Sequence, residues 1–422
     1  MEALEKKNYT LPIAMMFALF FMISFVTGLQ NPMGVIVKNQ FGVSNLMSQL
    51  GNAANFIAYA FMGIPAGMML QRIGYRKTTL SAIGVGFVGV GVSFLSGQIG
   101  SFAVYLVGAF IAGFAMCMLN TVVNPMVNTL GGGGKRGNQL IQFGGTISSI
   151  GATIVPVFVG YLIGDIARAN ITDANPALFL AMGIFILAFV VFSLINIPEP
   201  RQLVRERKIE KDGNSALSFR HFVLGTVAIF MYVGVEVGIP NISNLFMTGE
   251  LGIDPTVAGT VVGTYWFLML IGRFAGGVLG ARFSSKTMLS FSSLLAMLFV
   301  LLAIFSPLEV KVNMPVFLSD ISFGMAEVPI NIMFLVLCGL CTSVMWGGIF
   351  NLAVEGLGKY TEAASGIFML MVCGGGILPL IQGGVADFSS YLSSYWVIFA
   401  CLLFLLYYAL LGSKNVNKDI PV

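Results

Sequence analysis

Twelve long apolar stretches restrict what this chain can fold into more than any other feature of its sequence. About 20 apolar residues span the hydrocarbon of a bilayer, and backbone groups cannot stay unpaired there, so each stretch must be a helix. Only 9% of the 422 residues are charged, against about a quarter in soluble domains. We therefore expect an all-α membrane protein with twelve transmembrane helices. The predicted spans are 11–36, 46–70, 78–97, 101–128, 140–164, 177–197, 220–247, 256–281, 286–306, 328–354, 363–386 and 392–412.

Lysine and arginine are distributed very unevenly between the connections. Most lie in the terminal segments and in alternate connections, and only Lys38, Arg168 and Lys311 fall on the other side. Positively charged connections remain in the cytoplasm. We therefore expect a multi-pass protein of the bacterial inner membrane with both termini cytoplasmic. The net charge of +4 is small and gives no reason to expect a nucleic-acid partner.

One charged connection divides the spans into two sets of six. It predicts an N-terminal six-helix bundle at 1–197, a cytoplasmic linker at 198–219 and a C-terminal six-helix bundle at 220–422. The connection between the ninth and tenth spans, 306–327, is the least regular stretch. Its pattern leaves open whether it contains a short surface helix.

Two turns, one in each half, repeat the same spacing. The first contains Gly67, Arg72 and Arg76, and the second contains Gly277, Arg282 and Lys286. In both, arginine follows glycine by five residues and the next cation follows by four, and the two turns are 210 residues apart. Such repetition is typical of transporters built from two parallel repeats. We expect the glycines to allow close helix approach and the arginines to have gating or structural roles.

These turns resemble the signature loop of the major facilitator superfamily, G-x-x-x-D-R-x-G-x-[RK]-[RK], with Gln71 in place of the usual acid. Further segments resemble the fucose–galactose–glucose:proton symporter family. They include 64–67 (IPAG), 120–125 (NTVVNP), 232–236 (YVGVE), 265–266 (YW), 272–274 (GRF) and 356–361 (GLGKYT). The resemblance implies two bundles around a central cavity, alternating access, and import of a neutral hexose or deoxyhexose, in many members with a proton.

The first half of the chain departs from that family in one respect. Between Glu5 and Asp165 there is no aspartate or glutamate. The resemblance implies proton-coupling acids at two positions that align with Asn31 and Asn120. Intramembrane carboxylates are the usual proton carriers in transporters. Proton coupling is therefore expected in the second half, with Glu236 of the seventh span as the candidate, or the protein is a proton-independent sugar facilitator.

Amides are the main candidates for substrate binding. Gln30 and Asn31 lie on the first span, Asn120 and Asn124 share one face of the fourth, and Gln142 lies on the fifth. Amides both donate and accept hydrogen bonds, which suits the hydroxyl groups of a sugar. The same side chains also commonly join neighbouring membrane helices, and the sequence leaves both roles open.

Further candidates lie in the second half. Tyr232, Glu236, Trp266 and Trp346 are expected to contact substrate, since aromatic rings stack on sugars, or to pack between helices. Arg273 is expected to reach the membrane surface or to pair with Glu355, in a gating or structural role.

No cofactor or metal is expected. The chain has a single histidine, and the C-x-x-C at Cys338 and Cys341 lies in an apolar span, so a zinc site has too few ligands. The sequence contains no recognisable nucleophile–base pair, so we do not expect an enzyme. The expected partners are a small neutral sugar, a coupled proton and the lipid bilayer, with a monomer as the functional unit. The remaining alternative is a membrane receptor that binds a solute without moving it.

Overall fold

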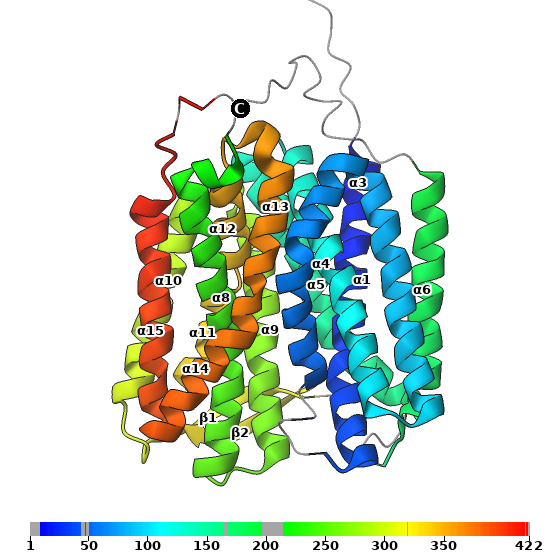
Figure 1. Ribbon diagram of the computed structural model, residues 1–422. Helices are drawn as coiled ribbons and strands as arrows, with labels where there is room; N and C mark the ends of the chain where they lie inside the picture. The colour runs from blue at the N-terminus through cyan, green and yellow to red at the C-terminus, as the bar shows by residue number, and fades with distance from the viewer. Residues whose placement is uncertain are drawn as a thin grey trace, which may run out of the picture.

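The computed structural model describes residues 9–43, 47, 50–163, 168–195, 214–318, 320–417 and 419–420. Most of these residues form long helices that run side by side (Figure 1). The helices are α1 (Thr10–Phe41), α3 (Leu50–Ile99), α4 (Phe102–Leu130), α5 (Gly134–Ile163), α6 (Asn175–Leu194), α8 (Arg220–Leu245), α9 (Pro255–Leu279), α10 (Ser285–Phe305), α11 (Ile330–Thr342), α12 (Met345–Val354), α13 (Thr361–Leu370), α14 (Gly374–Phe388) and α15 (Tyr391–Tyr407).

Each of the twelve predicted spans falls mainly on helix where the structure describes it. Ten stretches of the described residues are long and apolar enough to cross a membrane, and one of them, Ala53–Ile99, contains two crossings. Gly74, with φ 82°, interrupts α3 between these crossings. This positive φ is readily available only to glycine. α5 supplies the remaining crossing, and two crossings are each built from a pair of helices, α11 with α12 and α13 with α14.

The helices gather into two groups that stand beside each other in Figure 1. We call residues 9–195 the N-terminal half and residues 214–420 the C-terminal half. The linker end of the molecule, at the top of Figure 1, contains the turns at 74–77, 131–134, 280–284 and 355–360. The opposite, hairpin end contains the connections at 100–101, 168–174, 251–254 and 306–329. Residues 198–213 of the predicted linker and residues 1–8 lie outside the described part.

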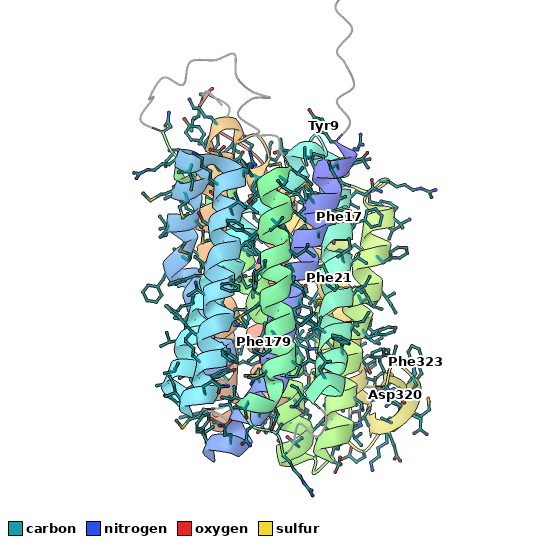
Figure 2. The ribbon with its side chains drawn as sticks, turned by 90° about the vertical axis from the view of Figure 1, so that its right-hand side faces the viewer. Tyr9, Phe17, Phe21, Phe179, Asp320 and Phe323 are labelled. Carbon is teal, nitrogen blue, oxygen red and sulfur yellow. The ribbon has the colours of Figure 1, made fainter. Side chains whose placement is uncertain are left out.

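An antiparallel hairpin lies in the irregular connection 306–327 and extends to Pro329, and it is the exception to the all-helical expectation among the described residues. Its strands are β1 (Lys311–Phe317) and β2 (Phe323–Pro329), with Phe317 opposite Phe323. The Phe317 ring stacks on Phe267 of α9, with centroids 4.5 Å apart. The Phe317 amide donates to Thr264 Oγ1 at 2.9 Å. The hairpin is therefore fixed to the flank of α9, where Figure 2 shows Asp320 and Phe323.

The repeated turns place their glycines against the opposite half. A Cβ on Gly67 would lie 3.0 Å from the Cα of Gly366 in α13. A Cβ on Gly277 would lie 2.6 Å from the ring of Phe143 in α5. The expectation of close helix approach at both glycines is confirmed.

The arginines of these turns make different contacts. Arg76 donates through its guanidinium to the carbonyls of Phe192 and Ser193 at the end of α6. Arg72 is exposed. The carbonyl of Arg282 accepts a hydrogen bond from Lys135 Nζ at 2.9 Å, which joins the two halves at the linker end.

Candidate functional site

Hydrogen bonds join the two halves from the linker end to the middle of the helices. The pairs are Lys135 with Arg282, Asn138 with Met288, Gln142 with Val344, Asn124 with Trp346, Thr121 with Ser365, and Gly145 and Ser149 with Arg273. They are made by α4 and α5 on one side and by α9 to α13 on the other. The structure is therefore closed at the linker end.

Arg273 is bound on both sides of this boundary. Its Nη2 donates to Oε1 of Glu236 at 3.0 Å, and the two side chains are only 16% and 13% exposed. Its Nη1 donates to Ser149 Oγ at 2.7 Å and to the carbonyl of Gly145 at 3.4 Å. Glu236 belongs to α8 of the same half, whereas Gly145 and Ser149 belong to α5 of the other. One guanidinium thus connects a buried carboxylate to the contact between the halves.

Pairing of Arg273 with Glu355, one of the two alternatives expected for it, was wrong. Glu355 follows α12 at the linker end, where its carbonyl lies 2.9 Å from Nε2 of His221. A guanidinium removed from water needs an anionic partner at the same depth along the helices. Glu236 provides this partner. The relevant signal in the sequence was only that both residues lie inside spans.

Two tyrosines surround Glu236. Tyr265 donates through its hydroxyl to the backbone carbonyl of Glu236 at 3.2 Å and lies 3.1 Å from Thr342 Oγ1. Tyr232, one turn before Glu236, is fully buried, and its hydroxyl lies beside the Glu236–Arg273 pair. That hydroxyl forms no hydrogen bond of ordinary geometry with the described residues.

The predicted amide face of the fourth span is present on α4. Asn120 is partly exposed and donates to the hydroxyl of Tyr59 at 2.9 Å. Asn124 is fully buried, donates to the carbonyl of Asn120 at 2.9 Å, and accepts from Trp346 Nε1 at 3.2 Å. Tyr59 was not predicted, because one tyrosine in an apolar helix forms no recognisable pattern.

Trp346 lies at a break in the tenth crossing, between α11 and α12. Its ring is 6.3 Å from that of Tyr232 and 6.1 Å from that of Phe368, both edge to face. At this break the carbonyl of Val344 accepts from Gln142 Nε2 of α5 at 2.8 Å and from the N–H of Gly348 at 3.2 Å. Broken helices at mid-membrane depth are where secondary transporters commonly bind substrate.

The structure therefore brings six predicted residues to one boundary: Asn120, Asn124, Gln142, Tyr232, Glu236 and Trp346. Trp266 is seven residues before Arg273, nearly two turns along the same face of α9. Its side chain is 38% exposed, and its ring meets Tyr265 edge to face at 5.3 Å. The side chains of Gln30 and Asn31 lie outside the described part of the structure. Contact of these nine residues with substrate, and of Glu236 with a proton, stays a prediction.

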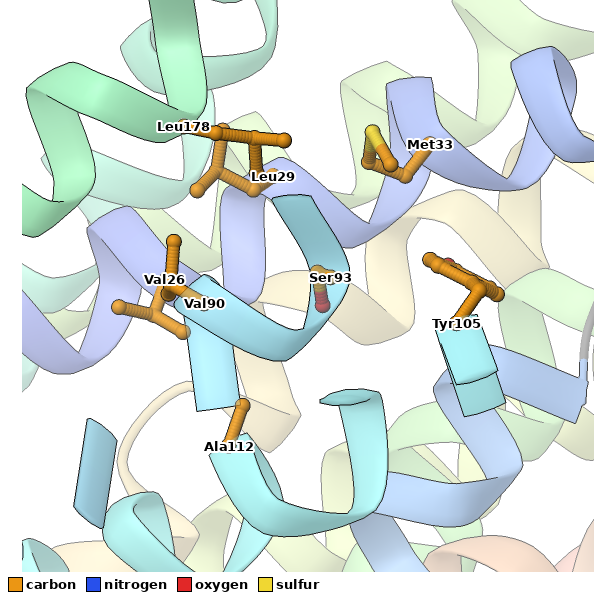
Figure 3. A pocket seen from close by; sticks show the side chains of 8 residues that line it. All are labelled: Val26, Leu29, Met33, Val90, Ser93, Tyr105, Ala112 and Leu178. Carbon is orange, nitrogen blue, oxygen red and sulfur yellow. The ribbon is translucent and has the colours of Figure 1, made fainter. Parts of the chain in front are cut away.

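A separate cavity lies inside the N-terminal half and is not part of this boundary. It is formed by α1, α3, α4 and α6, and all but two of its lining side chains are apolar (Figure 3). The exceptions are Ser93, which already donates to the carbonyl of Gly89, and Tyr105. A sugar needs several donors and acceptors, so this cavity does not suit one.

Comparison with known proteins gives consistent matches over the whole chain. A model of the Major Facilitator Superfamily matches residues 16–235 and 224–420. The glucose/galactose transporter of Brucella abortus is 28% identical over 98% of this chain and 97% of its own length. The L-fucose-proton symporter of Escherichia coli is 22% identical over 92% of this chain and 89% of its own length. The crystal structure of the transporter FucP in the outward conformation matches with a TM-score of 0.81 and 20% identity, over 96% of this chain and 100% of that chain.

Proposed function

The chain belongs to the major facilitator superfamily, and we propose that it imports a neutral hexose or deoxyhexose by proton symport with alternating access. Its relatives carry the names of glucose/galactose and fucose–proton transporters and match it over nearly their full lengths. The observation that carries the proposal is the buried Glu236–Arg273 pair, next to amides and aromatic rings at the boundary between the halves.

The sugar would bind among the amides and aromatic rings of this boundary. Asn120, Asn124 and Gln142 would bond its hydroxyls, and Trp346 and Tyr232 would contact its apolar face. Asn124 and Gln142 now bond the other half. Exchange of these bonds for bonds to sugar hydroxyls changes the free energy little, because each amide stays paired. Gln30, Asn31 and Trp266 complete the proposed set.

Glu236 would carry the proton. The N-terminal half has amides at Asn31 and Asn120 and no acid between Glu5 and Asp165. Glu236, in contrast, is held within the protein at mid-helix and is paired with Arg273. A carboxylate in that position is a functional candidate by default.

We propose that the linker end faces the cytoplasm of a bacterium and that a single chain in the inner membrane is the working unit. Arg72, Lys77, Arg136 and Arg282 are all exposed at the linker end, and positive charge is retained on the cytoplasmic side. A structure closed at that end is then one in which substrate enters from outside.

Uptake of radiolabelled hexoses into proteoliposomes tests the proposal. With an imposed gradient, acidic outside, we expect glucose, galactose or fucose to accumulate above the external concentration, and without a gradient we expect only equilibration. Liposomes without protein and a panel including a charged sugar phosphate are the controls. If none of the neutral sugars enters faster than in empty liposomes, the proposed substrate class is wrong.

A sugar facilitator is the second candidate, and the amides at Asn31 and Asn120 favour it. It predicts equal final levels with and without the gradient, together with rapid exchange of internal for external sugar. The same uptake experiment therefore separates the two.

A further inference from the structure

We propose that Arg273 is a positioning residue through which the charge of Glu236 controls whether the linker end is closed. The proposal rests on Glu236 as the proton site of the function proposed above, but it does not depend on which substrate is carried. It starts from one observation: the two ends of the same guanidinium bind Glu236 in one half and α5 in the other.

The partners of Arg273 differ in charge. Glu236 is an acid, whereas Ser149 offers a hydroxyl and Gly145 a backbone carbonyl. The two neutral groups can orient the guanidinium but cannot balance its charge. In the closed state, charge balance of Arg273 therefore depends on Glu236 alone.

No other charged group shares this task among the described residues. The titratable groups that face Glu236 are Arg273 from α9 and Tyr232 from its own helix. Tyr265 of α9 bonds the backbone carbonyl of Glu236. The other helices packed on α8, which are α11, α12, α13, α14 and α15, bring no charged side chain to the carboxylate among the described residues.

The sign of the effect follows from this arrangement. With Glu236 ionised, the pair is neutral and the contact of Arg273 with Ser149 is stable. When Glu236 takes a proton, a cation without counter-charge remains at the closed boundary, and such a cation is strongly destabilising. Separation of α5 from α9 lets water reach the guanidinium and relieves this. Protonation of Glu236 therefore favours opening of the linker end, and loss of the proton favours closure.

Hydrogen exchange at a single pH tests the proposal without any sugar. Glu236→Gln mimics the protonated acid, since it retains the shape and removes the charge. In lipid nanodiscs we expect backbone amides in 134–149 and 273–283 to exchange about tenfold faster than in the wild type. The matched control is Glu327→Gln, which breaks the exposed Lys311–Glu327 pair, whose side chains are 62% and 61% exposed. It should leave both peptides unchanged.

The double variant Glu236→Gln with Arg273→Met separates a charge effect from a loss of contacts. It removes the unbalanced cation, so we expect protection of both peptides to return toward the wild-type value. Unchanged exchange in Glu236→Gln would overturn the proposal, and so would a double variant that exchanges as fast as the single one. If Glu236→Gln alone does not fold, a folded double variant supports the proposal and an unfolded one contradicts it.

Sugar uptake by the same proteins distinguishes the two levels of inference. If the proposed substrate class is wrong, the wild type takes up none of these sugars, while the hydrogen-exchange results remain as expected. If the Arg273 proposal is wrong, only the hydrogen-exchange results differ from those expected.

Discussion

Two contacts close the linker end, and they are built from different chemistry. The glycine seam joins α3 to α13 through Gly63, Gly67 and Gly366, where a Cβ on Gly63 would lie 2.6 Å from the backbone nitrogen of Leu370. The polar seam joins α5 to α9 and α12 through Gln142, Ser149 and Arg273.

The difference between the seams indicates how closure is controlled. The glycine seam consists of uncharged backbone in direct contact, so its stability depends on shape. The polar seam contains a cation whose partner is a carboxylate, so its stability depends on whether Glu236 is ionised. The molecule thus combines one contact that is insensitive to protons with one that responds to them.

The largest effect is expected from filling the glycine seam. Gly63→Ala places a methyl group 2.6 Å from the Leu370 nitrogen and 2.7 Å from the Gly366 carbonyl oxygen, and backbone atoms cannot move aside as a side chain can. Overpacking of this kind costs about 1–3 kcal/mol. Initial sugar uptake should fall by about tenfold or more at every pH.

The matched control is Gly84→Ala in the same helix element, where an added Cβ meets nothing within 4 Å. It should transport at the wild-type rate. Wild-type uptake by Gly63→Ala would show that the glycine seam does not have to close for transport.

The next effect concerns Glu236→Gln and is selective. Accumulation driven by a pH gradient should be abolished, because the side chain can no longer take up and release a proton. Exchange of internal for external sugar should continue, since it requires no net proton movement. Both are measured in the same proteoliposomes, with Glu327→Gln as control. Retained accumulation would remove Glu236 from the coupling mechanism.

A smaller effect is expected from Gln142→Leu in the polar seam. The change removes the donor that α5 supplies to the carbonyl of Val344, which keeps the N–H of Gly348 at 3.2 Å. The cost to closure is therefore that of one hydrogen bond, about 0.5–1.5 kcal/mol. Uptake should slow several-fold with no change in its dependence on pH, because the Glu236–Arg273 pair is intact. Gln98→Leu, at an exposed position of α3, is the control. A shifted pH dependence would mean that the amide, rather than the ion pair, senses the proton.

The smallest effect is expected from Lys135→Ala. Lys135 Nζ donates to the carbonyl of Arg282 at the exposed edge of the linker end. Exposed charged contacts contribute about 0–1 kcal/mol, so initial uptake should remain within about twofold of the wild type. A loss as large as that of Gly63→Ala would place the main closing contact at this edge instead of in the seams.

The sequence was sufficient for the helices and for the shared face of two amides on α4. Span length and hydropathy predicted a helix at every crossing, and the spacing of Asn120 and Asn124 placed them on one face of α4. Which residues form hydrogen bonds between the two halves was not predictable. Asn124 meets Trp346 and Gln142 meets Val344 across more than 200 residues of chain, and such contacts depend on how the halves pack.

Two other features show the same limit. The predicted pairing of Arg273 with Glu355 was wrong, because position along a helix does not give the depth to which a long side chain reaches. The hairpin at β1 and β2 was left undecided because its short strands, with Pro315 in one of them, have little periodicity. Its stability comes from the contacts of Phe317 with Phe267 and Thr264 of α9.

The most direct test of the account is the pH change that accompanies sugar entry. Proteoliposomes in weak buffer, without an imposed gradient, are given a transported hexose while the external pH is recorded. The account predicts that the external medium becomes more alkaline with the wild-type protein, and that Glu236→Gln, which still exchanges internal for external sugar, causes no pH change. Sugar entry without alkalinisation in the wild type, or unchanged alkalinisation in Glu236→Gln, would contradict it.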